Sequence, residues 1–152
     1  QETNIPGIYA AGDAAQTLDV VYGEDHINAL WPVAVEQGRV AALNMAGIPA
    51  SYPGSLARNI LAAFGVSVFA AGAGRAERGY EIRTQEGPGF YRKIVLDKGI
   101  LKGFIFVGEA RNEGLYTSLI GMKADVSAYA GSLLRGSYGY SRHLARACRQ
   151  AV

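Results

Sequence analysis

The sequence predicts an α+β fold, an antiparallel sheet with flanking helices, preceded by the truncated end of a βα unit. Three observations support this prediction. A short apolar run near the N-terminus leads to one clear helical pattern, and two prolines follow within residues 49–53. The rest of the chain alternates strand and hairpin patterns before a final helical stripe. The 152 residues amount to about one domain of typical length.

Composition excludes several classes of protein. Because 49% of the residues are hydrophobic and 18% are charged, a disordered low-complexity chain is excluded. Fifteen Lys and Arg against thirteen Asp and Glu leave a net charge of +2, which is too small to predict a nucleic-acid partner. The single cysteine excludes an internal disulfide and a Cys-based zinc site within the chain. It fits a reducing compartment, so we expect a cytoplasmic location.

The sequence predicts no membrane partner. The N-terminus lacks the basic segment and apolar core of a signal peptide. The longest uncharged apolar run, residues 60–74, is shorter than the ~20 residues that a membrane span needs. We therefore interpret this run as buried globular structure.

A short buried strand with an acid at its C-terminal end is the first predicted element. A turn at Pro6-Gly7 precedes the apolar run Ile8–Ala11. Open α/β sheets bind ligands at the carboxyl ends of their strands. Asp13 is therefore a candidate to accept hydrogen bonds from sugar-type hydroxyls, and Gly12 lets a ligand approach the backbone. The alternative is that Asp13 only caps the turn at Ala14-Ala15.

A helix is the next predicted element, after a polar stretch at residues 16–28 that we expect to be a loop. It begins at Trp31, where Pro32 suits the first helical position, and it ends before Gly47. Small residues dominate one face, so we expect that face to pack closely against a sheet or a ligand. The face consists of Leu30, Ala34, Gln37, Ala41 and Met45.

Strand and hairpin patterns fill the second half of the chain. We expect strands over 66–71, 80–86, 90–96 and 100–107, of which the last two flank a hairpin turn. Both faces of Phe104–Val107 are apolar, so this strand is predicted to be central and covered on both sides. A single helix is predicted from 115 to 135. Its apolar stripe consists of Leu115, Leu119, Met122, Val126, Tyr129 and Leu133.

Two segments resemble a known family. Residues 3–15, TNIPGIYAAGDAA, look like the second flavin-binding motif of the FAD-dependent pyridine nucleotide–disulfide oxidoreductases. Residues 30–41, LWPVAVEQGRVA, are similar to the helix that follows in the nitrite reductase, rubredoxin reductase and NADH oxidase branch. Three further segments, 59–68, 91–95 and 101–109, resemble less specifically the C-terminal domain of that branch.

The resemblance implies that FAD contacts two groups of residues. In the family, the aspartate matching Asp13 binds a ribityl hydroxyl, and the helix N-terminus faces the pyrimidine edge of the flavin. The free N–H groups of a helix N-terminus stabilise electron density at that edge. The implied cofactor-binding residues are Gly12, Asp13, Ala14, Leu30, Trp31, Pro32 and Val33. From the residues alone, Trp31 could equally be a core aromatic, and Pro32 an ordinary helix start.

The sequence departs from the family pattern at two motifs. His26 and His143 are followed by Ile27 and Leu144, so neither forms the His-Pro-Thr acid/base motif of the glutathione-reductase branch. The sequence also lacks the Gly-x-Gly-x-x-Gly motif that would hold the FAD pyrophosphate. We assign no catalytic residue and no metal site, since neither Asp25-His26 nor the pair Glu109 and Glu113 has a convincing metal-ligand spacing.

The resemblance gives each part of the chain a role. Residues 1–48 are the truncated Rossmann-like tail of an FAD-binding domain, 49–55 a linker, 56–140 the C-terminal α+β domain and 141–152 a basic tail. The implied function is that of a C-terminal fragment of an FAD-dependent NAD(P)H oxidoreductase, inactive alone. The alternative is a non-catalytic dimerisation module. Implied partners are the upstream FAD and NAD domains, a second copy of the chain and a small acidic electron carrier docked on the tail.

Overall fold

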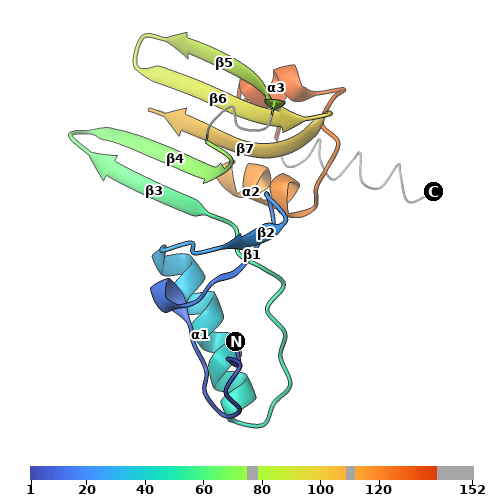
Figure 1. The fold of residues 1–152 in the computed structure, drawn as a ribbon. Helices are drawn as coiled ribbons and strands as arrows, with labels where there is room; N and C mark the ends of the chain where they lie inside the picture. The colour runs from blue at the N-terminus through green and yellow to red at the C-terminus, as the bar shows by residue number, and fades with distance from the viewer. Residues whose placement is uncertain (75–78, 109–111, 140–152) are drawn as a thin grey trace. The chain divides into compact units, whose positions relative to one another are not determined.

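The computed structural model describes residues 1–74, 79–108 and 112–139. It divides the chain into two compact units, residues Gln1–Arg58 (the first unit) and Asn59–Val152 (the second unit) (Figure 1). The second unit has the predicted α+β fold, an antiparallel sheet with helices packed against it. In the described ranges, no helix combines the length and apolar character that crossing a bilayer requires.

The first unit begins without the predicted strand over Ile8–Ala11. Only Tyr9 pairs, in an isolated antiparallel bridge with Glu2, and Ile8 is exposed. Among the described residues, the backbone of this segment bonds residues at the start of the sequence, through the Thr3 N–H to the Ile8 carbonyl and the Ala10 N–H to the Gln1 carbonyl. A strand buried in a sheet needs partners on both sides. The prediction of a buried strand was therefore wrong.

The predicted loop at residues 16–28 contains a small antiparallel hairpin. Strands β1 (Thr17–Asp19) and β2 (Glu24–His26) pair in register, with Leu18 opposite Asp25. Sequence patterning missed them because both strands are short and largely polar. Their stability comes from the buried Asp19 carboxylate, which accepts the Val21 and Tyr22 N–H groups at 2.8 and 3.2 Å. The carboxylate thus closes the turn that joins the two strands.

The same carboxylate ties the hairpin to the segment that follows the helix. Its second oxygen accepts the Asn28 amide at 2.8 Å, and the same amide donates to the Ser55 hydroxyl at 2.7 Å. Ser55 is fully buried, and its N–H donates to the Leu18 carbonyl. Asp19, Asn28 and Ser55 therefore form one buried polar network inside the first unit.

Helix α1 (Trp31–Met45) begins where the sequence predicts, with Pro32 in its first turn. Its buried positions are Val33, Gln37 and Ala41, which recur every fourth residue. The predicted packed face was thus only partly right: Gln37 and Ala41 are buried, but Met45 is exposed. The buried stripe is centred on Gln37 because this face packs against η1 (Gly12–Ala14), a single 3₁₀ turn.

The second unit is built on a five-stranded antiparallel sheet in the order β3-β4-β7-β6-β5. The strands are β3 (Arg58–Ala63), β4 (Val66–Gly72), β5 (Glu81–Gly87), β6 (Phe90–Asp97) and β7 (Ile100–Val107). All four predicted strands are present, and β3 is an addition. β7 is central, as predicted, but only one of its faces is deeply buried: Phe104 and Phe106 are in the core, whereas Ile105 and Val107 are half-buried.

Two helices cover the core face of this sheet where the sequence predicts one. α2 (Glu113–Gly121) contacts β7 and β4, and α3 (Ala130–Leu134) contacts β5 and β6. Between them Lys123 takes a positive φ of 50°, and Asp125 forms a bridge with Ile100. The chain therefore leaves the helical path to pair with the start of β7. The predicted continuous helix over 115–135 was wrong.

The predicted apolar stripe nevertheless forms the core. Leu115, Leu119, Val126 and Leu133 are all fully buried, whereas Met122 is exposed in the turn between the helices. Tyr116 packs against Phe106 with the ring centroids 4.8 Å apart, edge to face, and its hydroxyl donates to the Leu133 carbonyl at 2.7 Å. That bond joins α2 to α3.

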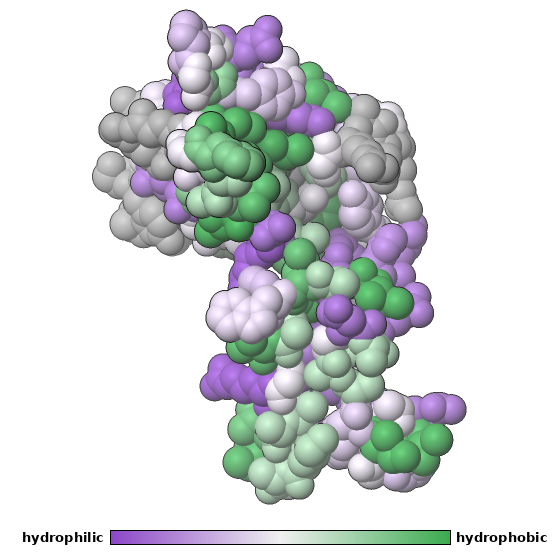
Figure 2. Space-filling model, turned by 90° about the vertical axis from the view of Figure 1, so that its left-hand side faces the viewer, coloured by the Kyte–Doolittle hydropathy of each residue, from purple (hydrophilic) through white to green (hydrophobic). Residues whose placement is uncertain are grey.

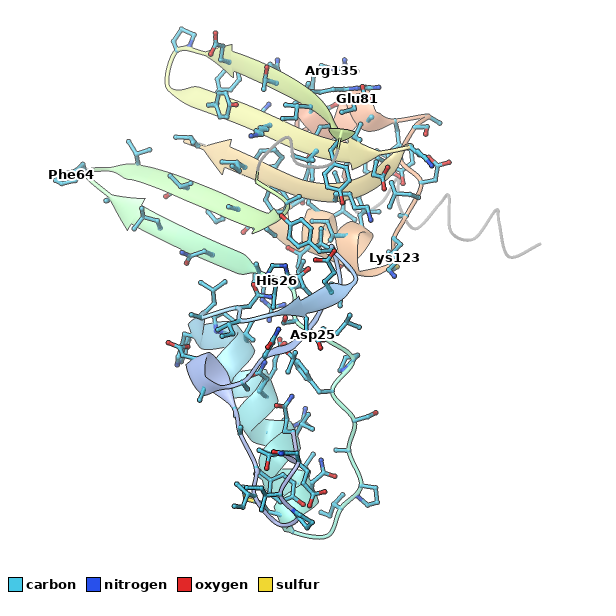
Figure 3. All side chains as sticks on the ribbon, viewed as in Figure 1. Asp25, His26, Phe64, Glu81, Lys123 and Arg135 are labelled. Carbon is cyan, nitrogen blue, oxygen red and sulfur yellow. The ribbon has the colours of Figure 1, made fainter. Side chains whose placement is uncertain are left out.

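The hairpin of β3 and β4 is the exposed apolar part of the second unit. Ile60, Leu61 and Val66 are exposed, and Phe64 at the tip is fully exposed and points away from the sheet (Figure 3). Figure 2, which faces this end of the hairpin, shows apolar surface there. The interpretation of residues 60–74 as buried was therefore wrong for the hairpin and right only near its end, where Ala71 and Ala73 are buried.

Candidate functional site

The two predicted flavin-contacting segments lie side by side in the first unit. Gly12, Asp13 and Ala14 form η1, and η1 contacts helix α1, whose N-terminus carries Leu30 to Val33. The residues therefore meet although a polar stretch of about fifteen residues separates the two segments in sequence. The structure places all seven predicted site residues within one compact unit.

Gly12 sits where only glycine fits easily. Its φ is +74°, in the left-handed region, and a Cβ built there would lie 3.3 Å from the Ala34 Cβ. Its N–H donates to the Gln37 Oε1 at 2.7 Å. The turn is thus packed tightly against α1, and its conformation is fixed by the helix.

Asp13 lies in the middle of this turn and is exposed. Within the described part of the chain, no hydrogen bond or ion pair is found for its carboxylate, and the Ala15 N–H bonds the Gly12 carbonyl instead. The alternative role of Asp13 as a cap of the turn finds no hydrogen bond to support it. The carboxylate remains available to accept hydrogen bonds from a ligand.

The N-terminus of α1 is open. Its N-cap residue is Leu30, in an extended conformation with no side-chain capping bond, and the first turn contains no acidic residue. Trp31 is 82% exposed, which excludes its alternative role as a core aromatic in this unit. Val33 is buried and anchors the first turn. Among the described residues, the Trp31 and Val33 N–H groups thus have no acceptor, and no acidic side chain of the first turn offsets the positive end of the helix dipole.

These observations fit the donor and acceptor set that a flavin needs. A ribityl chain has hydroxyl groups that can donate hydrogen bonds to a carboxylate. The pyrimidine edge of a flavin is electron-rich, and the positive end of a helix stabilises such a group. The turn and the helix end are held together by direct packing of Gly12 on Ala34. The residues present therefore fit FAD at this place.

Gln37 is a residue of this site whose hydrogen bonds the sequence did not show. It was expected on a packed helix face, but its bonds to Gly12 and to Thr17 could not be read from a local pattern because both partners are at least twenty residues away. The signal that could have found it is a polar amide in the middle of an apolar stripe, since a buried amide requires partners.

The other candidate sites are weak or outside the described residues. Asp25 and His26 are exposed on β2 (Figure 3), and the His26 ring lies 5.5 Å from that of Tyr22. Among the residues that the structure describes, no group of three metal-ligating side chains occurs. Glu109, His143 and the basic tail at 141–152 lie outside the described residues.

Comparisons with known proteins point to one family. The chain is 34% identical over 129 residues to the NAD(P)H nitrite reductase of Bacillus subtilis, which covers 83% of this chain and 15% of the relative. It is 31% identical over 131 residues to the NADH-dependent phenylglyoxylate dehydrogenase subunit epsilon of Aromatoleum evansii, with 83% and 31% covered. No family model matches.

Solved structures agree with these relatives. The persulfide reductase of A. fulgidus matches with a TM-score of 0.72 and 24% identity, over 85% of this chain and 28% of that one. The NADH:rubredoxin oxidoreductase of Clostridium acetobutylicum matches with a TM-score of 0.58 and 28% identity, over 84% and 30%. The chain thus spans less than a third of the length of each of these four proteins. These relatives and structural neighbours are FAD-dependent pyridine nucleotide–disulfide oxidoreductases, and the chain matches a partial, C-terminal region of them.

Proposed function

We propose that this chain is the C-terminal part of an FAD-dependent NAD(P)H oxidoreductase. In this proposal the first unit contacts the ribityl and flavin parts of FAD, and the second unit is the C-terminal domain that supports the flavin. The single observation that carries the proposal is the exposed Asp13 carboxylate on a turn packed against the uncapped N-terminus of α1. The comparisons support the class of enzyme.

Each group has a defined task. The Asp13 carboxylate accepts a hydrogen bond from a ribityl hydroxyl, which fixes the ribityl chain along η1. The Trp31 and Val33 N–H groups face the pyrimidine edge and favour electron density there, since the Leu30 N–H already donates to the Asn28 carbonyl and Pro32 has no N–H. FAD, when bound, supplies the redox chemistry, taking hydride from the nicotinamide and passing electrons to an acceptor. The residues of this chain bind and orient it.

The test is Asp13→Ala in the full-length protein that contains this chain. We expect FAD binding to weaken by about 1.5–3 kcal/mol, the usual worth of a hydrogen bond to a charged group. The measurement is the dissociation constant of FAD by isothermal titration calorimetry. Asp25→Ala is the matched control, because Asp25 is an exposed acid of the same unit on β2. Unchanged FAD affinity in Asp13→Ala would contradict the proposal.

A non-catalytic interface module is the second candidate, and one observation favours it. The apolar stripe first considered for this role is buried in the second unit, but the β3–β4 hairpin exposes Ile60, Leu61 and Phe64. Exposed apolar patches often mark contact surfaces. Sedimentation at two protein concentrations tests this candidate, since a monomer at the higher concentration excludes a dimer module.

A further inference from the structure

One buried amide links the helix to both sides of the Gly12–Ala14 turn. Gln37 is only 1% exposed in the middle of α1. Its Oε1 accepts the Gly12 N–H at 2.7 Å, and its Nε2 donates to the Thr17 Oγ1 at 3.0 Å. Gly12 opens η1, and Thr17 opens β1 just beyond it. The turn that carries Asp13 is therefore held at both ends by one side chain.

The amide fixes this arrangement more strictly than apolar packing would. A buried amide is costly unless its polar atoms are bonded, so Gln37 favours only the geometry in which both bonds form. The left-handed φ of Gly12 is part of that geometry. Gln37 also lies one helical turn after Val33, the buried anchor of the helix N-terminus. The same helix segment thus carries the open N–H groups and holds the turn.

We propose that Gln37 is a positioning residue for FAD, which sets the Asp13 carboxylate relative to the N-terminus of α1. This inference rests on the proposed function. Gln37 acts through Gly12 and the turn and needs no contact with the cofactor. A residue of this kind differs from a merely structural one, because its loss changes FAD binding more than its effect on folding accounts for.

The test uses the full-length protein and two substitutions at the same site. Gln37→Met keeps the length of the side chain and removes both bonds, whereas Gln37→Glu keeps an acceptor for the Gly12 N–H. The control is Asn44→Leu, because the Asn44 amide makes comparable bonds to the Val40 and Ala50 backbone at the other end of α1. The readouts are the FAD dissociation constant, the visible circular dichroism of bound flavin and the apo-protein unfolding temperature.

We expect Gln37→Met to weaken FAD binding about tenfold, the equivalent of one lost buried hydrogen bond. Gln37→Glu should recover most of that affinity. Asn44→Leu should lower the unfolding temperature at least as much as Gln37→Met, yet change the dissociation constant by less than about twofold. Equal losses of FAD affinity in Gln37→Met and Asn44→Leu would overturn the positioning role, because a general loss of stability would then explain both.

A double-mutant cycle separates this inference from the proposed function. If Gln37 acts through Asp13, Gln37→Met should cost clearly less affinity in the Asp13→Ala background than in the wild type. The same tenfold loss in both backgrounds overturns the inference alone. Unchanged affinity in Asp13→Ala overturns the proposed function together with the inference that rests on it. Weakened binding in Asp13→Ala with none in Gln37→Met overturns only the positioning role.

Discussion

Asp13 owes its position to the bonds of its neighbours, since its own carboxylate makes none with a described residue. Gly12 and Thr17 on either side of it are bonded to the same amide of Gln37. The sequence singled out Asp13 as the acid at the end of a predicted strand and through the motif at residues 3–15, and its contact with FAD stays a prediction. The sequence could not predict the bonds of Gln37, because side chains distant in sequence are joined only by the fold.

The free energy of unfolding should depend on pH through the buried Tyr116. Burial raises the pKa of Tyr116 to about 12, and the charge of Arg92 lowers it by less. The unfolded chain loses this proton near pH 10, whereas the folded chain keeps it. Stability is therefore fully present below pH 10 and falls as the pH rises from about 10 to 12. The free energy of unfolding measured over this range should fall less in Tyr116→Phe than in the wild type.

The Tyr116→Phe variant should also be less stable at neutral pH. It removes the hydroxyl that bonds the Leu133 carbonyl, and a net hydrogen bond contributes about 0.5–1.5 kcal/mol. Tyr138→Phe is a suitable control, since the Tyr138 ring is also buried but its hydroxyl makes no hydrogen bond to a described residue. An identical pH profile in wild type and Tyr116→Phe would contradict the assignment.

The elements of the two units differ in how far local patterning predicts them. α1 and the strands β4 to β7 were predicted from local signals, the proline at the helix start and the apolar runs bounded by turns. In β5 burial does not follow the apolar alternation, because Ile82 and Thr84 are exposed. The β1–β2 hairpin was missed because a buried Asp19 network holds polar strands together. The helix over 115–135 was predicted as continuous because its apolar spacing survives the break at Lys123. Tertiary pairing of Asp125 with Ile100 overrides the helical pattern there.

The turn of the β3–β4 hairpin contains a strained residue, Phe64. Phe64 and Gly65 join the strands, and both have positive φ, 53° and 77°. Two-residue turns of this kind favour Asn-Gly, and a bulky residue in the left-handed region is strained. Because the Phe64 side chain is fully exposed, Phe64→Asn loses no packing within the chain. It should raise the free energy of unfolding by roughly 0.5–1 kcal/mol.

Chemical denaturation of the two hairpin variants provides the measurement. Gly65→Ala should act in the opposite direction, since alanine opposes a φ of 77°. A destabilised Phe64→Asn protein would contradict the prediction. It would indicate that Phe64 packs against another chain or domain, as the interface candidate requires.

At the scale of the whole molecule, the chain combines a sheet unit that has its own apolar core with a smaller unit that carries the proposed FAD contacts. The second unit has a core of Phe104, Phe106 and Tyr116, closed by two helices. The first unit has small polar strands and one helix, and its stability relies on the Asp19 and Gln37 networks. The chain spans 15% of the B. subtilis nitrite reductase and 28% of the A. fulgidus persulfide reductase. Its sequence predicted the family through two motifs and a linker at residues 49–55, whereas the buried networks of the first unit became visible only in the fold.

These 152 residues alone should fold without retaining FAD. The family holds the FAD pyrophosphate at a glycine-rich helix N-terminus, and these residues contain no Gly-x-Gly-x-x-Gly motif. One carboxylate and one helix end supply about 1–3 kcal/mol per charged contact. Immobilising a ligand costs about 4–15 kcal/mol, so these contacts do not suffice to retain FAD. The measurement is flavin absorbance that co-elutes with the purified chain on gel filtration after incubation with FAD, beside the full-length protein as control. Stoichiometric yellow protein would contradict the prediction and would mean that η1 and α1 form a complete site.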